Sequence, residues 1–138
     1  QTMFAEFEKL IHEMEESGAA LTLESLRRTY RGLLDSYFGT GVVIDDSLEL
    51  ECLRIPHFYS AFYVYKYATG ISAAISLATD VLRSGETERY FGFLRSGGSR
   101  FSIDTLAEAG VDMNSPAPVN AALDLFERRV GELEALLS

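Results

Sequence analysis

Residues 58–83 read FYSAFYVYKYATGISAAISLATDVLR, and this stretch decides the fold prediction. Its first half is apolar or aromatic on nearly every side, which is typical of a helix that is buried on all faces. Its second half is interrupted by Thr69, Ser72, Ser76, Thr79 and Asp80, so the stretch is too polar to span a membrane. We therefore expect one long helix from about Phe58 to about Arg83, as the central element of the protein.

Two amphipathic helices are predicted before this stretch. Apolar residues recur at helical spacing from Phe4 to Met14, and the pattern stops near Gly18. A second helix is expected to begin after Thr22, whose side chain suits an N-cap, and to end at Gly39. Each helix has one apolar stripe, so each needs a packing partner.

The other elements are shorter, except for a final helix. The prediction is all-α and bundle-like, with residues 1–138 as a single helical unit, because no repeat and no break in composition divides them. The predicted elements are an extended segment at 42–44, a return to helix at 47–53 before Pro56, helices at 86–94 and 103–109, and a helix from Pro116 or Pro118 to Leu137.

Composition argues against several classes of function. The chain has 21 acidic residues against 12 basic ones, and its arginines are scattered, so a nucleic-acid partner is not expected. Neither a signal peptide nor a membrane span is expected. The single cysteine, Cys52, excludes a disulfide within the chain. We interpret Cys52 as a buried structural thiol rather than a nucleophile, in a protein of the reducing cytoplasm.

A zinc-peptidase pattern is incomplete in the first helix. The segment His12-Glu13-Met14-Glu15-Glu16 has a histidine followed by a glutamate, but the second histidine of such a motif is replaced by Glu16. No third ligand is evident nearby, and adjacent acidic residues on an amphipathic helix usually form a solvated face. We therefore expect no metal site in this chain.

Four of the seven tyrosines and one of the two histidines lie between Arg54 and Gly70. If the segment is helical, Tyr59, Tyr63 and Tyr67 share one stripe. One explanation is that these are core aromatics, which is what most aromatic stripes are. The other is that the hydroxyls converge on a cleft, because burying a phenol is costly unless its hydroxyl finds a partner. Donors of this kind can stabilise a developing oxyanion.

The segment Phe93-Leu94-Arg95-Ser96-Gly97-Gly98-Ser99-Arg100 also has two explanations. It is either a helix C-cap followed by a flexible connector, or a loop whose backbone amides contact a peptide. A phosphate-binding loop is not supported, since neither a GxGxxG nor a GK[ST] pattern is present.

The amino-acid sequence of the aromatic segment resembles that of a known family. Ile55-Pro56-His57-Phe58-Tyr59 followed by Phe62-Tyr63-Val64-Tyr65-Lys66-Tyr67-Ala68-Thr69-Gly70 is similar to the oligoendopeptidase F family, which is related to the thimet oligopeptidase zinc metallopeptidases. The resemblance extends to Gln1–Glu8 before it, and to 93–99 and 109–113 after it. It implies a mostly helical cytoplasmic peptidase that hydrolyses short peptides, of which this chain is the C-terminal segment.

The resemblance also implies roles for individual residues. Family members hold zinc with an HExxH helix and a downstream glutamate, and none of these ligands can be placed in this chain. The resemblance instead matches the family's substrate-contacting residues, and it implies catalytic roles for His57, Tyr63 and Tyr65. Substrate-binding roles are implied for Tyr59 and Tyr67, with Tyr67 also open to a packing role, and for Gly97 and Gly98.

We therefore expect the chain alone to bind no zinc and to cleave no peptide. Its implied partners are peptide substrates and the missing N-terminal part of the same enzyme, and self-association through an exposed apolar face is also expected. The alternative is a self-contained helical protein-interaction module without catalysis.

Overall fold

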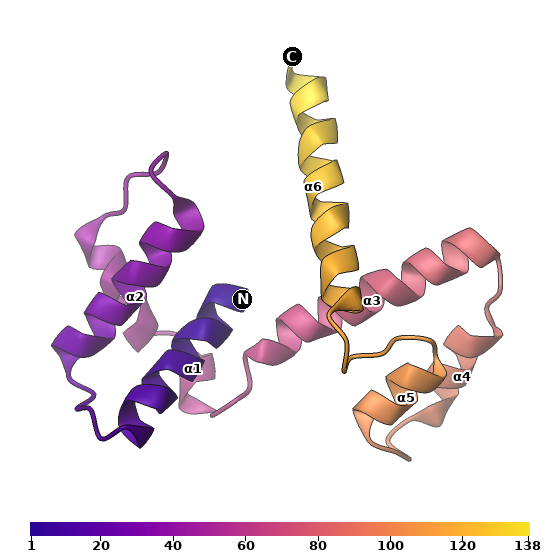
Figure 1. The fold of residues 1–138 in the computed structure, drawn as a ribbon, viewed down its shortest axis with the longest axis horizontal. Coiled ribbons are helices and arrows are strands. Elements are labelled where there is room, and N and C mark those ends of the chain that lie inside the picture. The colour runs from indigo at the N-terminus through magenta and orange to yellow at the C-terminus, as the bar shows by residue number, and fades with distance from the viewer. The chain divides into compact units, whose positions relative to one another are not determined.

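The computed structural model describes residues 1–138 and contains six α-helices and two 3₁₀ helices, with no strand. The all-α prediction is therefore confirmed. The chain divides into two compact units, residues 1–68 and 69–138, and each is described by itself (Figure 1). The expectation that residues 1–138 act as one helical unit stays a prediction.

The first unit is built on two helices, α1 (Thr2–Glu16) and α2 (Leu23–Phe38), which pack side by side. The predicted ends of α2 are confirmed. Thr22 and Ser25 form a capping box in which each side chain accepts a hydrogen bond from the other's backbone amide. Gly39 follows α2 with φ +66°, a left-handed conformation that glycine adopts without strain. The buried core comprises Met3, Phe7, Tyr30, Leu33, Leu34 and Cys52.

The segment after α2 packs back on that helix. The predicted return to helix before Pro56 is present as the 3₁₀ helix η1 (Asp46–Leu53), and residues 43–45 before it have no regular secondary structure. Ion pairs join the two elements, because Glu49 contacts Arg27 at 2.9 Å and Arg31 at 3.3 Å. These contacts hold η1 against α2.

The predicted long helix from Phe58 to Arg83 is wrong in its first part. The chain forms the 3₁₀ helix η2 (Pro56–Tyr59), passes through an irregular segment, and enters α3 (Tyr65–Ser84) seven residues later than expected. The break is at Phe62, whose φ of +56° is incompatible with a right-handed helix. The expectation of burial on all faces also fails, because Tyr59 is 77% exposed and Phe62 is 56% exposed.

The second unit consists of most of α3 with three further helices, α4 (Glu88–Ser96), α5 (Ser102–Glu108) and α6 (Ala117–Leu137). Its small buried core comprises Ala73, Leu77, Ala109 and Val111. The predicted start of the last helix is confirmed, with Pro116 as N-cap and Pro118 in the first turn.

Helix α6 keeps the predicted apolar register, but its side chains are largely exposed. Figure 1 shows it as one straight helix at the C-terminal end of the chain. Phe126 is 69% exposed and Leu136 is 84% exposed. None of the helices combines the length and the hydropathy that crossing a membrane requires.

Candidate active site

The structure divides the predicted site residues between the two units. His57 and Tyr59 belong to η2, Tyr63 lies in the irregular segment after it, and Tyr65 and Tyr67 lie in the first turn of α3. These five residues are all in the first unit, whereas Gly97 and Gly98 follow α4 in the second. The two groups are therefore considered separately.

His57, Tyr63 and Tyr67 form a cluster of three rings. The His57 and Tyr63 rings are parallel within 6°, with centroids 5.5 Å apart. The Tyr67 ring meets both of them edge to face, at 5.3 Å from His57 and 5.9 Å from Tyr63. Such geometries are the favourable ones for aromatic pairs. The structure therefore brings together one imidazole and two phenols on a partly exposed surface.

A hydrogen bond joins two members of this three-ring cluster. The Tyr67 hydroxyl oxygen lies 3.2 Å from His57 Nε2, and the tautomer of the imidazole decides which of the two groups donates. Hydrogen bonding with Tyr63, followed by desolvation and the charge of Tyr63, raises the pKa of Tyr67 above its ordinary value. A phenol is already protonated at neutral pH, and the shift extends that protonated state to higher pH.

A cation lies beside the cluster. Lys66 Nζ is 4.7 Å from the centroid of the Tyr63 ring, within the range of a cation–π interaction. The ammonium charge of Lys66 therefore lies over the ring of Tyr63. A negative charge that develops near these rings would be favoured by it.

Tyr59 and Tyr65 are placed differently from the cluster. The expectation that Tyr59, Tyr63 and Tyr67 share one helical stripe is wrong, because no helix joins Tyr59 to Tyr63. The Tyr59 hydroxyl donates a 2.6 Å hydrogen bond to the carbonyl of Leu53, while its ring faces solvent. Tyr65 is the first residue of α3 and is 49% exposed.

Two residues of α1, Glu8 and His12, contact the segment beside the cluster, a role that the sequence analysis gave to neither of them. Glu8 is only 3% exposed, and its Oε1 accepts a 2.7 Å hydrogen bond from the backbone amide of Phe62, next to Tyr63. His12 Nδ1 lies 2.7 Å from the Glu8 carbonyl oxygen, and its ring packs against Phe62 with centroids 4.5 Å apart and planes tilted by 37°. A sequence signal existed for Glu8, since it falls within the apolar stripe formed by Phe4, Phe7 and Ile11.

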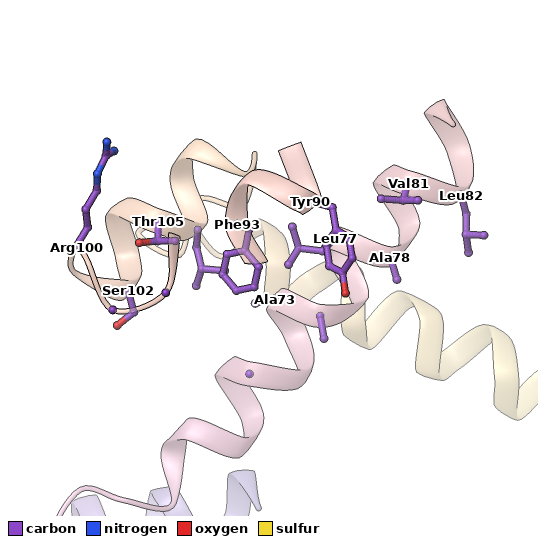
Figure 2. A pocket seen from close by; sticks show the side chains of 15 residues that line it. Ala73, Leu77, Ala78, Val81, Leu82, Tyr90, Phe93, Arg100, Ser102 and Thr105 are labelled. Carbon is purple, nitrogen blue, oxygen red and sulfur yellow. The ribbon is translucent and has the colours of Figure 1, made fainter. Parts of the chain in front are cut away.

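The second unit contains an open apolar cavity of about 850 Å³. Helix α3 supplies one wall through Gly70, Ala73, Ala74 and Leu77, and Tyr90 and Phe93 of α4 supply another (Figure 2). Gly97, with φ +53°, and Gly98 line its margin. In Figure 2, Arg100 extends away from the apolar side chains, and it forms an ion pair with Glu108.

The side chains of this chain do not fit the zinc that the family resemblance implies. No group of three or more His, Cys, Asp or Glu residues is close enough together to hold a metal ion. The expected burial of Cys52 is confirmed, and that burial raises the pKa of its thiol. The chain therefore offers hydrogen-bond donors and an apolar cavity rather than a metal centre.

Comparison with known proteins places these features in a wider context. The model of peptidase family M3 matches residues 1–125. Oligopeptidase PepF of Bacillus subtilis (strain 168) is 51% identical over 99% of this chain. An oligoendopeptidase F homolog of Borreliella burgdorferi is 44% identical, also over 99% of the chain.

Solved structures share the fold. The crystal structure of oligoendopeptidase-F from Enterococcus faecium superposes with a TM-score of 0.94, at 40% identity over 99% of this chain. That of a putative peptidase from Chlamydophila abortus has a TM-score of 0.87 over 97% of this chain, at 40% identity.

All these relatives are much longer than this chain. It spans 21% of the Bacillus protein and 23% of the Borreliella protein. It likewise covers 26% and 23% of the two solved chains. The features described above therefore correspond to one part of each relative.

Proposed function

The chain belongs to peptidase family M3, and from this membership we propose that it forms the substrate-binding, oxyanion-stabilising part of a longer zinc metalloendopeptidase that hydrolyses short peptides. The chain would be a C-terminal portion of that enzyme, in the cytoplasm. The observation that carries the proposal is the three-ring cluster, in which an imidazole and two phenols share a partly exposed surface. The alternative of a self-contained interaction module is not favoured by the similarity to peptidases along the whole chain.

Zinc is assigned to residues outside this chain, because residues 1–138 offer no ligand set. When bound there, zinc would supply Lewis-acid chemistry at the scissile carbonyl. The residues of this chain would contribute hydrogen bonds to the same substrate. This division of roles explains how the chain can belong to a metallopeptidase family without containing a metal site.

His57 and Tyr63 are proposed to donate hydrogen bonds to the substrate carbonyl oxygen as negative charge develops on it. A donor of this kind contributes most when its position is already set before the reaction. The parallel stacking of the two rings supports such preorganisation, since it limits the rotation of both. Tyr65, half exposed at the first position of α3, is proposed as a further donor.

Tyr67 is proposed to bind substrate and to orient His57. If His57 Nε2 donates to the Tyr67 oxygen, the phenolic proton is left for the hydrogen bond with Tyr63 or for a peptide carbonyl that takes its place. Tyr59 is proposed to contact substrate through its exposed ring, as its hydroxyl is already bound to the Leu53 carbonyl.

Gly97 and Gly98 are proposed to contact the peptide through their backbone. A Cβ built at either position meets no atom within 4 Å, so the space above both glycines is open. They lie at the margin of an apolar cavity, which suits an apolar substrate side chain. Gly98→Ala is expected to raise KM for peptides, because the added methyl group would occupy that open space.

The proposal is tested by steady-state kinetics of the full-length protein on short fluorogenic peptides, with its zinc content measured. Tyr63→Phe and His57→Gln are each expected to lower kcat about 10²- to 10³-fold, the usual effect of removing one oxyanion donor. Tyr37→Phe is the matched control, because it removes a hydroxyl that bonds to Glu6 within the same unit. Full kcat in both Tyr63→Phe and His57→Gln would contradict the assignment.

A further inference from the structure

Tyr63 lies in a segment without regular structure, between η2 and α3. The position of its ring therefore depends on what holds residues 60–64. One long-range contact holds this segment: the Phe62 amide donates a 2.7 Å hydrogen bond to Glu8 Oε1, which joins residues 54 positions apart. Glu8 is 3% exposed, so the acceptor side of this hydrogen bond is shielded from water, although Phe62 itself is 56% exposed.

Phe62 has an unusual backbone. Its φ of +56° is the only positive value at a non-glycine residue of the chain. A bulky side chain disfavours this left-handed conformation, which persists only where neighbouring groups hold it. The holding groups are both in α1, at positions four residues apart on one helix face. Glu8 holds the amide of Phe62, and His12 packs on its ring at 4.5 Å.

The left-handed turn determines the direction in which Tyr63 leaves the segment. Tyr63 follows Phe62 directly, and its ring lies parallel to His57. If Phe62 returned to the right-handed or extended region, the backbone would leave this residue in another direction, and the stacked arrangement would be lost. The contact between Glu8 and Phe62 is thus linked by one peptide unit to the three-ring cluster.

We propose that Glu8 is a positioning residue of the peptidase: by accepting the hydrogen bond of the Phe62 amide, it fixes the left-handed turn that sets Tyr63 against His57. The catalytic part of this inference rests on the proposed function, whereas its structural part does not. Glu8 itself does not touch substrate in this assignment. Its effect on the reaction passes through Tyr63.

The test uses four variants of the full-length protein. Glu8→Leu removes the acceptor, Glu8→Gln keeps an acceptor oxygen without the charge, and Glu8→Asp keeps the charge but shortens the side chain. Glu6→Leu is the matched control, because Glu6 lies on the same helix and accepts a hydrogen bond from Tyr37. Zinc content and circular dichroism are measured for each.

Glu8→Leu is expected to lower kcat about 10- to 100-fold, which corresponds to losing one hydrogen bond to a charged group. Glu8→Asp should show a smaller loss, Glu8→Gln should retain most of the activity, and Glu6→Leu should match the wild type. If Glu8→Leu does not fold, Glu8→Asp carries the test. An unchanged kcat in Glu8→Leu, or in Glu8→Asp where Glu8→Leu does not fold, overturns the inference.

A double-mutant cycle separates positioning from general stabilisation. If Glu8 acts through Tyr63, then Glu8→Leu or Glu8→Asp should cost little further activity in a Tyr63→Phe background. Equal losses in both backgrounds would show a merely structural role and overturn the inference. The Tyr37→Phe background, in which full additivity is expected, serves as the control.

Hydrogen exchange keeps this inference distinct from the proposed function. The Phe62 amide should be protected in the wild type and in Glu8→Gln, and should exchange at least tenfold faster in Glu8→Leu or Glu8→Asp. Equal protection overturns the inference whether or not the protein is a peptidase. An inactive wild type with the expected exchange pattern would instead refute the proposed function and leave the structural part standing.

Discussion

The Tyr30 hydroxyl donates a 2.7 Å hydrogen bond to Glu51 Oε2, which ties the centre of α2 to η1. Tyr30 has no exposed surface. Burial first, and then the hydrogen bond and the charge of Glu51, raise the pKa of this phenol well above its ordinary value of 10.0. The folded chain therefore favours the protonated form of Tyr30 more strongly than the unfolded chain does.

This pKa shift predicts a loss of stability in alkali. Because the folded pKa is the higher one, the stabilisation is fully present below pH 10 and decreases as pH rises above it. Tyr30→Phe should cost about 1–3 kcal/mol at pH 8, through the lost hydrogen bond to a charged group. It should also reduce the fall in stability between pH 9 and about pH 11. Urea unfolding, monitored by circular dichroism, measures the stability at pH 8 and its fall with pH. Tyr59→Phe, at an exposed tyrosine, is the control.

The cap of α2 provides a second test of stability. Thr22 Oγ1 accepts a 3.1 Å hydrogen bond from the Ser25 amide, which would otherwise lack a partner in the first turn. Thr22→Ala should lower the free energy of unfolding by about 1 kcal/mol. Thr22→Ser retains the hydroxyl and should therefore keep most of the free energy of unfolding. Equal stability of the alanine and serine variants would show that the cap contributes little.

Helix ends could be predicted from the sequence because local chemistry determines them. Thr22 and Gly39 bound α2 as expected, and Pro116 begins α6, since capping and proline effects act within one turn. The break at Phe62 could not be predicted in this way. It depends on Glu8, which is 54 positions away and reaches the segment only once the first unit has folded.

The same limit applies to the candidate site. The sequence located the segment that contains it, because phenols and an imidazole are concentrated there. Which tyrosines meet His57 depends on the unpredicted break. Tyr63 and Tyr67 join it because the chain turns at Phe62, whereas Tyr59 remains with the Leu53 carbonyl. Helical periodicity grouped all three tyrosines and therefore placed Tyr59 wrongly.

The absence of a ligand set predicts how the 138-residue chain behaves with zinc. Purified chain incubated with zinc and then dialysed should retain well below one metal ion per molecule, because no three ligand side chains converge. It should also release no product from the short peptides that are used to test the proposed function. Elemental analysis and the peptide assay measure the two properties. One tightly bound zinc per molecule would contradict the assignment of the metal to residues outside 1–138.

The exposed stripe of α6 predicts self-association of the isolated chain. Leu123, Phe126 and Leu133 are 59%, 69% and 56% exposed, and they recur at helical spacing. A continuous apolar stripe of this kind is normally covered, and the relatives are long enough to cover it with residues that this chain lacks. Without that cover, light scattering should show a mass above 15.3 kDa that rises with concentration.

Substitution within the stripe distinguishes this mechanism from nonspecific aggregation. Replacing Phe126 and Leu133 with serine removes apolar area from the stripe, so the chain should shift towards a monomer. Asn120→Ser, a polar exchange at an exposed position of the same helix, should leave the mass unchanged. In the full-length protein the Phe126 and Leu133 exchanges should instead lower stability, by about 2 kcal/mol or more for each apolar side chain removed from packing. A chain that stays monomeric at all concentrations would show that the exposed apolar stripe does not drive association. That result would remove the reason to expect a segment that covers the stripe.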